Sequence, residues 1–436
     1  MELTRRTVRL ILLVSHFIAV AHCRDQLDVD DHIPFQLNDD NARRHPELPV
    51  LGYVTPWNPR GKDLVEEHRQ KFDIVCPVWY TVHPSSNDVE VYEVRGGPPA
   101  DEDRDWYKRL QTPSDTKPKA IQVTPRFILD GWSQDDYRQL MFNETRWHRL
   151  ATEITQVVED MAYNGIVFES GATHALSGPL GVLSDHLKEN GKTLVLVMPP
   201  IRTTLGMGDA AALNSHNAMM LQSISSLAGV ADYFSIMTYD MTGPGGHESL
   251  RQFPRSSQLH AAQQQHKVRE PGPNTNVEWV GANLIAFTDA AKSQDGYTNE
   301  QQFVFKDEVS AKFLMGLPLY GYKYPVFLAD DKKGIILQST ESVNGFSILR
   351  GAGEPVVMHQ IEELIAEYSP KLEEMDDGEF YFDYSAEDGL WRVFLPTPES
   401  MSNVLGVLDQ NEHIELGAGI ALWEVGQSSL DLLVTL

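Results

Sequence analysis

The stretch Val50-Leu51-Gly52-Tyr53-Val54-Thr55-Pro56-Trp57-Asn58-Pro59 decides between two possible folds. Its first five residues form an apolar run, which is typical of a strand buried on both faces. An open doubly wound sheet usually continues from its first strand into a glycine-rich turn. The residues that follow the run here contain two prolines and no glycine. The stretch therefore favours a closed barrel over an open doubly wound sheet.

Seven further apolar runs follow the first, and each is rich in Val, Ile, Leu or aromatic residues. The eight runs lie at residues 50–54, 72–82, 120–129, 165–168, 193–198, 233–239, 313–320 and 419–423. Amphipathic segments separate several of them, such as 145–163, where Leu150, Ile154 and Val158 recur at helical spacing. Eight buried strands separated by helices predict an α/β fold, a (β/α)8 TIM barrel.

The connection after the seventh run, residues 320–399, is too long to be a structureless loop. It contains strand-like runs at 334–337, 379–384 and 391–395 around a helical stretch at 357–368. We therefore predict a small α+β subdomain at about 321–396, inserted between strand 7 and helix 7. The barrel with this insertion would occupy residues 48–436.

Residues 1–21 have the pattern of a secretory signal peptide. Arg5, Arg6 and Arg9 form a positive segment, residues 10–21 are mostly apolar, and Ala19-Val20-Ala21 offers a cleavage site. A membrane anchor is the alternative, but twelve residues are too few to cross about 30 Å of hydrocarbon at about 1.5 Å per residue. We predict cleavage and secretion, an acidic N-terminal extension at 22–47, and no membrane span in the remaining chain.

Composition excludes several other classes of function. The formal net charge of −26 would repel phosphate backbones, which argues against nucleic acid as a partner. The chain has two cysteines, Cys23 and Cys76, too few for a disulfide framework or a multi-cysteine zinc site. Cys76 lies in an apolar run and is expected in the core, while pairing with Cys23 stays open. No metal site or cofactor is predicted. Asn143-Glu144-Thr145 predicts glycosylation of Asn143.

Aromatic side chains, with carboxylates between them, cluster where the predicted strands end. In barrels of this type the carboxyl ends of the strands carry the functional groups. The candidates at these ends are Tyr53, Trp57, Trp79, Trp132, Met237, Tyr239, Asp240, Tyr320, Trp423 and Glu424. Flat rings suit the C–H faces of a pyranose, and carboxylates suit its hydroxyl groups. The pattern therefore predicts a carbohydrate-binding cleft at the barrel mouth.

Three features carry a resemblance to a known family: Met237-x-Tyr239-Asp240 at the end of the sixth run, Trp423 in the eighth, and the insertion after the seventh. With these, residues 51–436 resemble the chitinase-like glycoside hydrolase family 18. The resemblance implies a groove that holds N-acetylated amino-sugar oligomers. Its closer members further imply lipopolysaccharide binding, a role in innate sensing, and passage to lysosomes through a scavenger receptor.

The catalytic strand of that family is degenerate in this sequence. The family carries Asp-Gly-x-Asp-x-Asp-x-Glu on strand 4, and the final Glu protonates the glycosidic oxygen, with the acetamide of the substrate as nucleophile. Residues 164–171 place Asn164, Val167, Glu169 and Gly171 at the four acidic positions. Glu169 lies two residues, about 6.6 Å, short of the acid position, whereas a general acid must reach within about 3 Å. The resemblance therefore implies no catalytic residue and an inactive lectin.

Strand alternation predicts where the side chain of Glu169 lies. Glu169 shares one face of its strand with Val167, while the large apolar Phe168 lies on the other face and suits packing against helices. We therefore expect Glu169 to face the barrel interior, with the Tyr239 hydroxyl and Asp240 as partners. Whether Glu169 contacts a sugar or is paired within the core stays open.

Two other functions remain as alternatives. One is a weak or unusual glycoside hydrolase that uses Glu169 or Glu424. The other is an interaction protein whose groove is vestigial and whose acidic surface does the binding. Chitooligosaccharides separate the three readings, since they would be bound intact, cleaved or ignored.

Overall fold

The computed structural model describes residues 42–84, 92–113, 118–202, 210–243, 271–292, 312–329, 336–337, 347–409 and 417–436. All of them lie in the compact unit Leu37–Leu436. The predicted signal peptide, Cys23 and residues 22–41 of the predicted extension lie outside the described residues.

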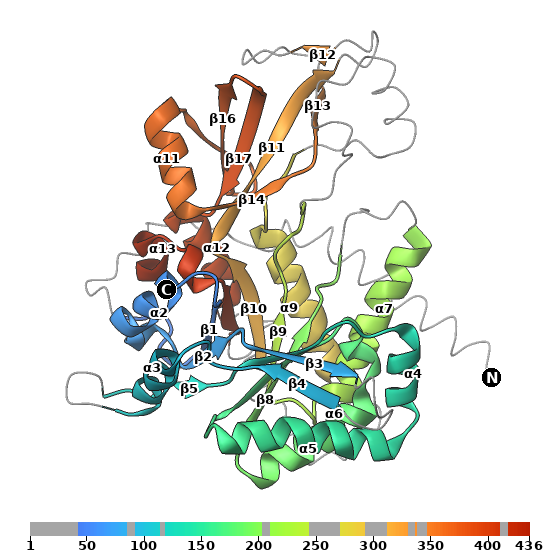
Figure 1. Ribbon diagram of the computed structural model, residues 1–436. Helices are drawn as coiled ribbons and strands as arrows, with labels where there is room; N and C mark the ends of the chain where they lie inside the picture. Colours follow the sequence, from blue (N-terminus) through green and yellow to red (C-terminus); the bar gives the residue numbers. More distant parts are fainter. Residues whose placement is uncertain are drawn as a thin grey trace. The chain divides into compact units, whose positions relative to one another are not determined.

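An eleven-stranded, mostly parallel sheet forms the main body of the described residues (Figure 1). Its strand order is β4-β3-β6-β7-β8-β9-β10-β18-β1-β2-β5. The strands are β1 Val50–Val54, β2 Ile74–Pro77, β3 Tyr80–Pro84, β4 Tyr92–Gly96, β5 Gln122–Val123, β6 Arg126–Leu129, β7 Gly165–Glu169, β8 Thr193–Met198, β9 Tyr233–Ile236, β10 Phe313–Pro318 and β18 Gly419–Trp423. Each of the eight predicted runs contains a strand. The short β4 is antiparallel to β3, and the other pairings are parallel.

The sheet curls round so that its two ends come from the same two predicted runs, each of which is broken into two strands. The second run gives β2 and β3, and the third gives β5 and β6. Since β2 pairs with β5 and β3 pairs with β6, both ends of the strand order belong to the same two runs. Pro125 lies at the break between β5 and β6, where a residue without an N–H can be accommodated. The predicted α/β TIM-barrel fold is confirmed.

Helices alternate with the barrel strands along the chain. They are α2 Arg60–Glu67, α3 Asp101–Gln111, α4 Gln134–Met141, α5 Glu144–Asp160, α6 Ser177–Glu189, α7 Ala210–Leu227, α9 Val277–Lys292, α12 Pro398–Leu408 and α13 Leu430–Thr435, with short 3₁₀ turns η2 Arg69–Lys71, η3 Thr173–Ala175 and η6 Val425–Gln427. Helix α5 corresponds to the amphipathic segment predicted at 145–163. Among the described helices, none is long and apolar enough to cross a membrane.

The insertion after β10 is built on a second, antiparallel sheet, drawn in orange in Figure 1. Its elements are β11 Tyr320–Ala329, β12 Ile336–Leu337, β13 Ser347–Arg350, β14 Glu354–Val357, α11 Met358–Tyr368, β15 Leu372–Glu374, β16 Phe380–Ala386 and β17 Gly389–Leu395. Strand β11 pairs with β12, β13, β14 and β17, and β16 pairs with β15 and β17. The predicted helix at 357–368 and the strands at 379–384 and 391–395 appear as α11, β16 and β17.

Alternate residues of the barrel strands point into and out of the barrel. Leu51 and Tyr53 on β1 belong to an interior cluster, whereas Val50 and Val54 belong to an outer cluster packed under the helices. The interior cluster also contains Cys76, which is fully buried and is a free thiol, as expected of a core residue. Burial raises the pKa of the Cys76 thiol, which keeps it protonated.

Candidate functional site

Trp423, the last residue of β18, lies at the centre of an aromatic cluster at the carboxyl ends of the strands. Its ring meets the Tyr53 ring edge-on, with 5.1 Å between the ring centroids and 65° between the planes. The Tyr239 ring lies nearly parallel to it, at 6.1 Å and 13°. Met237 packs against the same interior cluster, and the Trp423 side chain is only partly buried. Four of the predicted contact residues therefore lie in one cluster, in which Tyr53 is buried and the other three are partly exposed.

Tyr239 owes its position to a glycine on the neighbouring strand. A Cβ added at Gly316 would lie 2.8 Å from Cε1 of Tyr239, closer than such atoms approach. Burial, with the charges of Glu169 and Asp240, holds the pKa of Tyr239 well above its ordinary value. Its hydroxyl therefore stays protonated at neutral pH, with a proton available for a hydrogen bond.

Glu169 ends β7 on the face that points into the barrel. Val167, two residues earlier, belongs to the interior cluster, whereas Phe168 packs in the outer cluster. The predicted interior placement is therefore confirmed, and the Glu169 charge acts on Tyr239 as the expected nearness of the two residues implies. The hydrogen bond of Glu169, however, is made with a residue that was not predicted. Arg126 Nη1 instead donates to Oε2 of Glu169 at 3.1 Å. A guanidinium neutralises a partly buried carboxylate, which a neutral hydroxyl cannot do.

Arg126 was missing from the candidate residues, although strand parity could have identified it. Phe127 and Leu129 on β6 are large, apolar and packed in the outer cluster. Arg126 therefore faces inward, and in the register of the sheet it lies beside Val167. The interior of the mouth thus contains an ion pair, Arg126 with Glu169, rather than an isolated carboxylate.

Asp240 belongs to a network that fastens the turn after β9 to the insertion. Its Oδ1 accepts hydrogen bonds from the hydroxyls of Tyr320, at 2.5 Å, and Tyr322, at 2.7 Å. Its backbone N–H donates to Oδ1 of Asn274 at 2.7 Å, and its φ of 57° lies in the left-handed region, which Asp tolerates. The expected pairing of Asp240 with Glu169 is therefore wrong, since Asp240 Oδ1 instead accepts from two tyrosine hydroxyls of β11. Asn274 is a further member that the sequence did not single out.

Burial and the Asp240 charge raise the pKa of both tyrosines that contact Asp240. Tyr320 and Tyr322 therefore stay protonated and act as donors at neutral pH. The Tyr320 hydroxyl and Asp240 Oδ1 are thus engaged with each other, and this contact holds the turn that carries Tyr239.

Glu424 is buried beneath the rim, with 1% of its surface exposed. Thr55 Oγ1 donates a short hydrogen bond to one carboxylate oxygen, and Asn58 Nδ2 donates to the other at 3.0 Å. Burial raises the pKa of Glu424, while these two hydrogen bonds oppose the rise. The prediction that Glu424 contacts saccharide is therefore wrong. Both of its carboxylate oxygens accept hydrogen bonds that hold the loop after β1.

The remaining predicted rings do not share one surface. Trp57, in the loop after β1, is 65% exposed. Trp79, between β2 and β3, packs edge-on against Trp106 of α3 at 6.3 Å and joins the outer cluster, so its predicted place at the rim is wrong. Trp132 stacks on Tyr92 at 5.3 Å, and its indole N–H donates to a backbone carbonyl at 2.8 Å.

The four positions of the degenerate motif have different surroundings in the structure. Asn164 lies before β7, where its Oδ1 accepts hydrogen bonds from the Val123 N–H and the Gln111 amide, each at 2.8 Å. Val167 is fully buried. Gly171 is exposed, and the atom nearest to an added Cβ would be the Tyr137 hydroxyl at 3.9 Å. The position that the resemblance aligns with the acid of family 18 therefore has room for a side chain but carries none.

Within the described ranges, no group of three or more His, Cys, Asp or Glu side chains lies close enough to hold a metal ion. The site therefore offers an aromatic surface, a protonated tyrosine hydroxyl and an internal ion pair. Such a surface can stack on an apolar ring face and hydrogen-bond to its substituents.

Comparison with solved structures places this fold among chitinases, while no family model matches the chain. A chitinase from Chromobacterium violaceum is similar with a TM-score of 0.60 at 18% identity, covering 89% of this chain and 97% of that one. A family 18 chitinase from Cycas revoluta in complex with (GlcNAc)3 is similar with a TM-score of 0.55 at 14% identity, covering 89% and 97%. A class V chitinase from Pseudomonas fluorescens has a TM-score of 0.57 at 15% identity, covering 89% and 98%. At these identities the likeness establishes the shared fold, a chitinase-type TIM barrel with an inserted domain.

Proposed function

We propose that this chain is a secreted, catalytically inactive chitinase-like lectin that binds N-acetylated amino-sugar oligosaccharides at the barrel mouth. The observation that carries the proposal is the partly exposed Trp423 ring between Tyr53 and Tyr239. An indole face suits the C–H face of a pyranose, and the Tyr239 hydroxyl is available to donate to an acetamide or hydroxyl oxygen. The (GlcNAc)3 in the Cycas revoluta chitinase, which has the same fold, supports this class of ligand.

We propose that the protein does not hydrolyse its ligand, because neither candidate carboxyl group, Glu169 or Glu424, is free to act as the general acid. Gly171 has no proton to give, Glu169 is paired with Arg126, and both oxygens of Glu424 accept hydrogen bonds inside the protein. A weak glycoside hydrolase using Glu169 or Glu424 is therefore the less supported candidate. An interaction protein with a vestigial groove is disfavoured by the partly exposed Trp423.

Incubation with chitooligosaccharides is expected to give no product above that of a heat-treated control. Hydrolysis needs a general acid within about 3 Å of the glycosidic oxygen, and the acid position is Gly171. Chromatography of the sugars over several days measures this. Turnover that exceeds the control and disappears in Glu169→Gln would support the hydrolase instead.

We also propose a particular relative within the family. Residues 50–58 and Leu422-Trp423-Glu424-x-Gly426-Gln427 are similar to the chitinase domain-containing protein, also called stabilin-interacting chitinase-like protein. By that similarity, the ligands would extend to lipopolysaccharide, and a scavenger receptor of the stabilin type would carry the secreted protein to lysosomes. Binding to an immobilised receptor ectodomain tests this, and its absence would contradict it.

Glycosylation of Asn143 is expected when the chain is expressed in a eukaryotic secretory pathway. Asn143 caps α5 through its Oδ1, which accepts from the Arg146 N–H at 3.4 Å. A glycan on Nδ2 would leave this cap in place, and the neighbouring Thr145 is exposed. Treatment with a peptide N-glycosidase should lower the mass of the secreted protein, and Asn143→Gln should remove that difference. Identical masses before and after treatment would contradict the proposal.

A further inference from the structure

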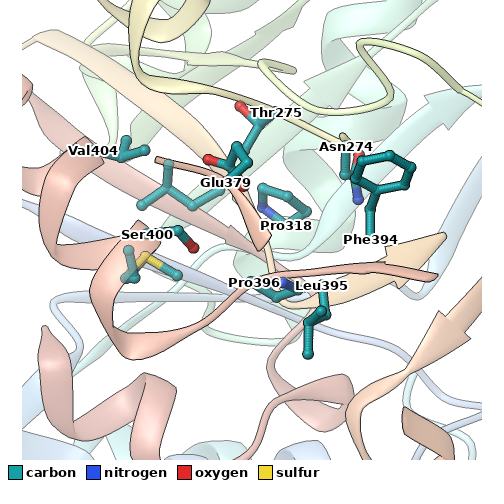
Figure 2. Close-up of a pocket in the computed structure, with 11 residues that line it drawn as sticks. Asn274, Thr275, Pro318, Glu379, Phe394, Leu395, Pro396, Ser400 and Val404 are labelled. Carbon is teal, nitrogen blue, oxygen red and sulfur yellow. The ribbon is translucent and has the colours of Figure 1, made fainter. Parts of the chain in front are cut away.

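Glu379, the residue before β16, points into a small cavity where the insertion packs on the barrel (Figure 2). The cavity volume is about 20 Å³, which is room for about one water molecule and too little for a sugar. Pro318, Phe394 and Val404 supply apolar walls. None of the residues that line the cavity is one of the predicted saccharide contacts.

The Glu379 carboxyl is buried without a hydrogen-bonding partner for one of its oxygens. The residue is 5% exposed, and its Oε1 has no partner among the described residues. Burial holds the pKa of Glu379 well above its ordinary value, and the charge of Asp377 raises it further. Asn274, Thr275 and Ser400 also line the cavity, with side chains that do not titrate in the relevant range.

The segment that lines the cavity also holds the barrel mouth. Asn274 Oδ1 accepts from the Asp240 N–H at 2.7 Å, and its Nδ2 donates to the Tyr320 carbonyl at 3.1 Å. Thr275 Oγ1 donates to the Thr238 carbonyl at 2.8 Å. The Asn274–Thr275 segment therefore connects the Glu379 cavity to both neighbours of Tyr239 in the chain.

We propose that Glu379 is a positioning residue that acts as a proton-dependent latch between the insertion and the barrel mouth. The neutral carboxyl fills the cavity beside Thr275 and supports the Asn274–Thr275 segment. An ionised carboxylate in this buried cavity would lie next to the Asp377 charge, with no cation from the described residues beside it and with Oε1 unpaired, so loss of the proton opens this contact. The turn at Asp240, and with it Tyr239, then loses one of its supports.

The sign of the pH dependence follows from the raised pKa. An unfolded Glu titrates near pH 4.3, at about its unperturbed value. The folded state binds its proton more tightly, so the stability that Glu379 contributes is complete below that pH and is lost as the pH rises through the folded pKa. In Glu379→Gln, a neutral side chain of nearly the same shape, this loss should disappear.

Melting temperatures between pH 4 and pH 8 test the latch, with Glu374→Gln as the matched control. Glu374 is an exposed glutamate on the adjacent strand β15. We expect Glu379→Gln to have the melting temperature of the wild type near pH 4 and a melting temperature about 2 °C or more higher at pH 8. The melting temperature of Glu374→Gln should equal that of the wild type at every pH. A constant difference between Glu379→Gln and the wild type at every pH would overturn the latch.

Asp377→Asn gives a second readout that does not replace Glu379 itself. Removing the Asp377 charge should lower the pKa of Glu379 and so reduce the loss of melting temperature between pH 4 and pH 8. If the melting temperature of Asp377→Asn falls between pH 4 and pH 8 by as much as that of the wild type, the proposal is contradicted.

A measurement of sugar binding distinguishes failure of the latch from failure of the proposed function. Only this measurement rests on the proposed function; the melting temperatures do not. The affinity of the wild type for (GlcNAc)3 should fall about tenfold from pH 5 to pH 8, whereas Glu379→Gln should keep its affinity. A pH-independent wild-type affinity would contradict the latch. Absence of binding at every pH would contradict the proposed function, and the melting curves would still decide on the latch.

Discussion

Replacing Trp423 by alanine is expected to weaken (GlcNAc)3 binding by about ten- to hundredfold while the barrel stays folded. By analogy with bases stacked on aromatic side chains, loss of a stacked ring costs about 1–3 kcal/mol of binding free energy. The indole is partly exposed and lies between the Tyr53 and Tyr239 rings. Its removal therefore takes away the ring on which the sugar is proposed to stack, the stacking platform.

Trp391→Ala is a matched control for this variant. Trp391 lies on β17 in the insertion, where its indole N–H donates to Asp388 at 3.0 Å, so its loss should leave the affinity unchanged. Calorimetric titration gives the affinities, and thermal unfolding shows how much of each variant is folded. If Trp423→Ala lowers the melting temperature but binds the sugar as tightly as the wild type, Trp423 is a core residue and not a platform.

Replacing Arg126 by methionine is expected to lower the free energy of unfolding by about 2 kcal/mol. The change leaves Glu169 inside the barrel mouth without its ionic partner, and an uncompensated buried charge costs about 3–5 kcal/mol when burial is complete. The two side chains here are 17% and 24% exposed, which reduces the cost.

The double variant Arg126→Met with Glu169→Gln separates charge from packing. With the carboxylate removed as well, we expect at least half of the lost stability to return. The midpoints of urea unfolding of both variants measure this. A double variant as unstable as the single one would show that Arg126 contributes by packing alone.

The fold could be predicted because each of the eight runs is rich in apolar residues. Eight such runs, and a first strand that enters a proline-containing loop, were enough to distinguish a closed barrel from an open sheet. The sequence did not indicate the breaks within the second and third runs, because an apolar run such as 72–82 looks the same whether it is one strand or two. The break between β2 and β3 places Trp79 in the outer cluster, against α3.

The alternation of side chains along a strand predicts which face a residue occupies when its neighbours in the chain are clearly apolar. Glu169 was placed correctly because Phe168 could only face the helices. Its partner could not be predicted, because the pairing with Arg126 depends on the register between β6 and β7. Asn274 lies far from Asp240 along the chain, and only the folded structure brings its amide to the Asp240 N–H.

The carboxylates at the rim were the least predictable part of the site. Glu424 and Asp240 follow strands whose ends form the mouth, so the sequence favoured both as ligand contacts. Their side chains instead accept hydrogen bonds from Thr55 and Asn58, and from Tyr320 and Tyr322. Sequence position alone does not distinguish a carboxylate that faces a ligand from one that anchors a loop.

Calorimetric titration of the unmodified protein with (GlcNAc)3, followed by recovery of the sugar, tests the central claim most directly. A carbohydrate-binding mouth without a catalytic acid predicts saturable binding and a sugar recovered intact. Heat of binding absent at the highest sugar concentration, or recovery of shorter oligomers, would contradict it.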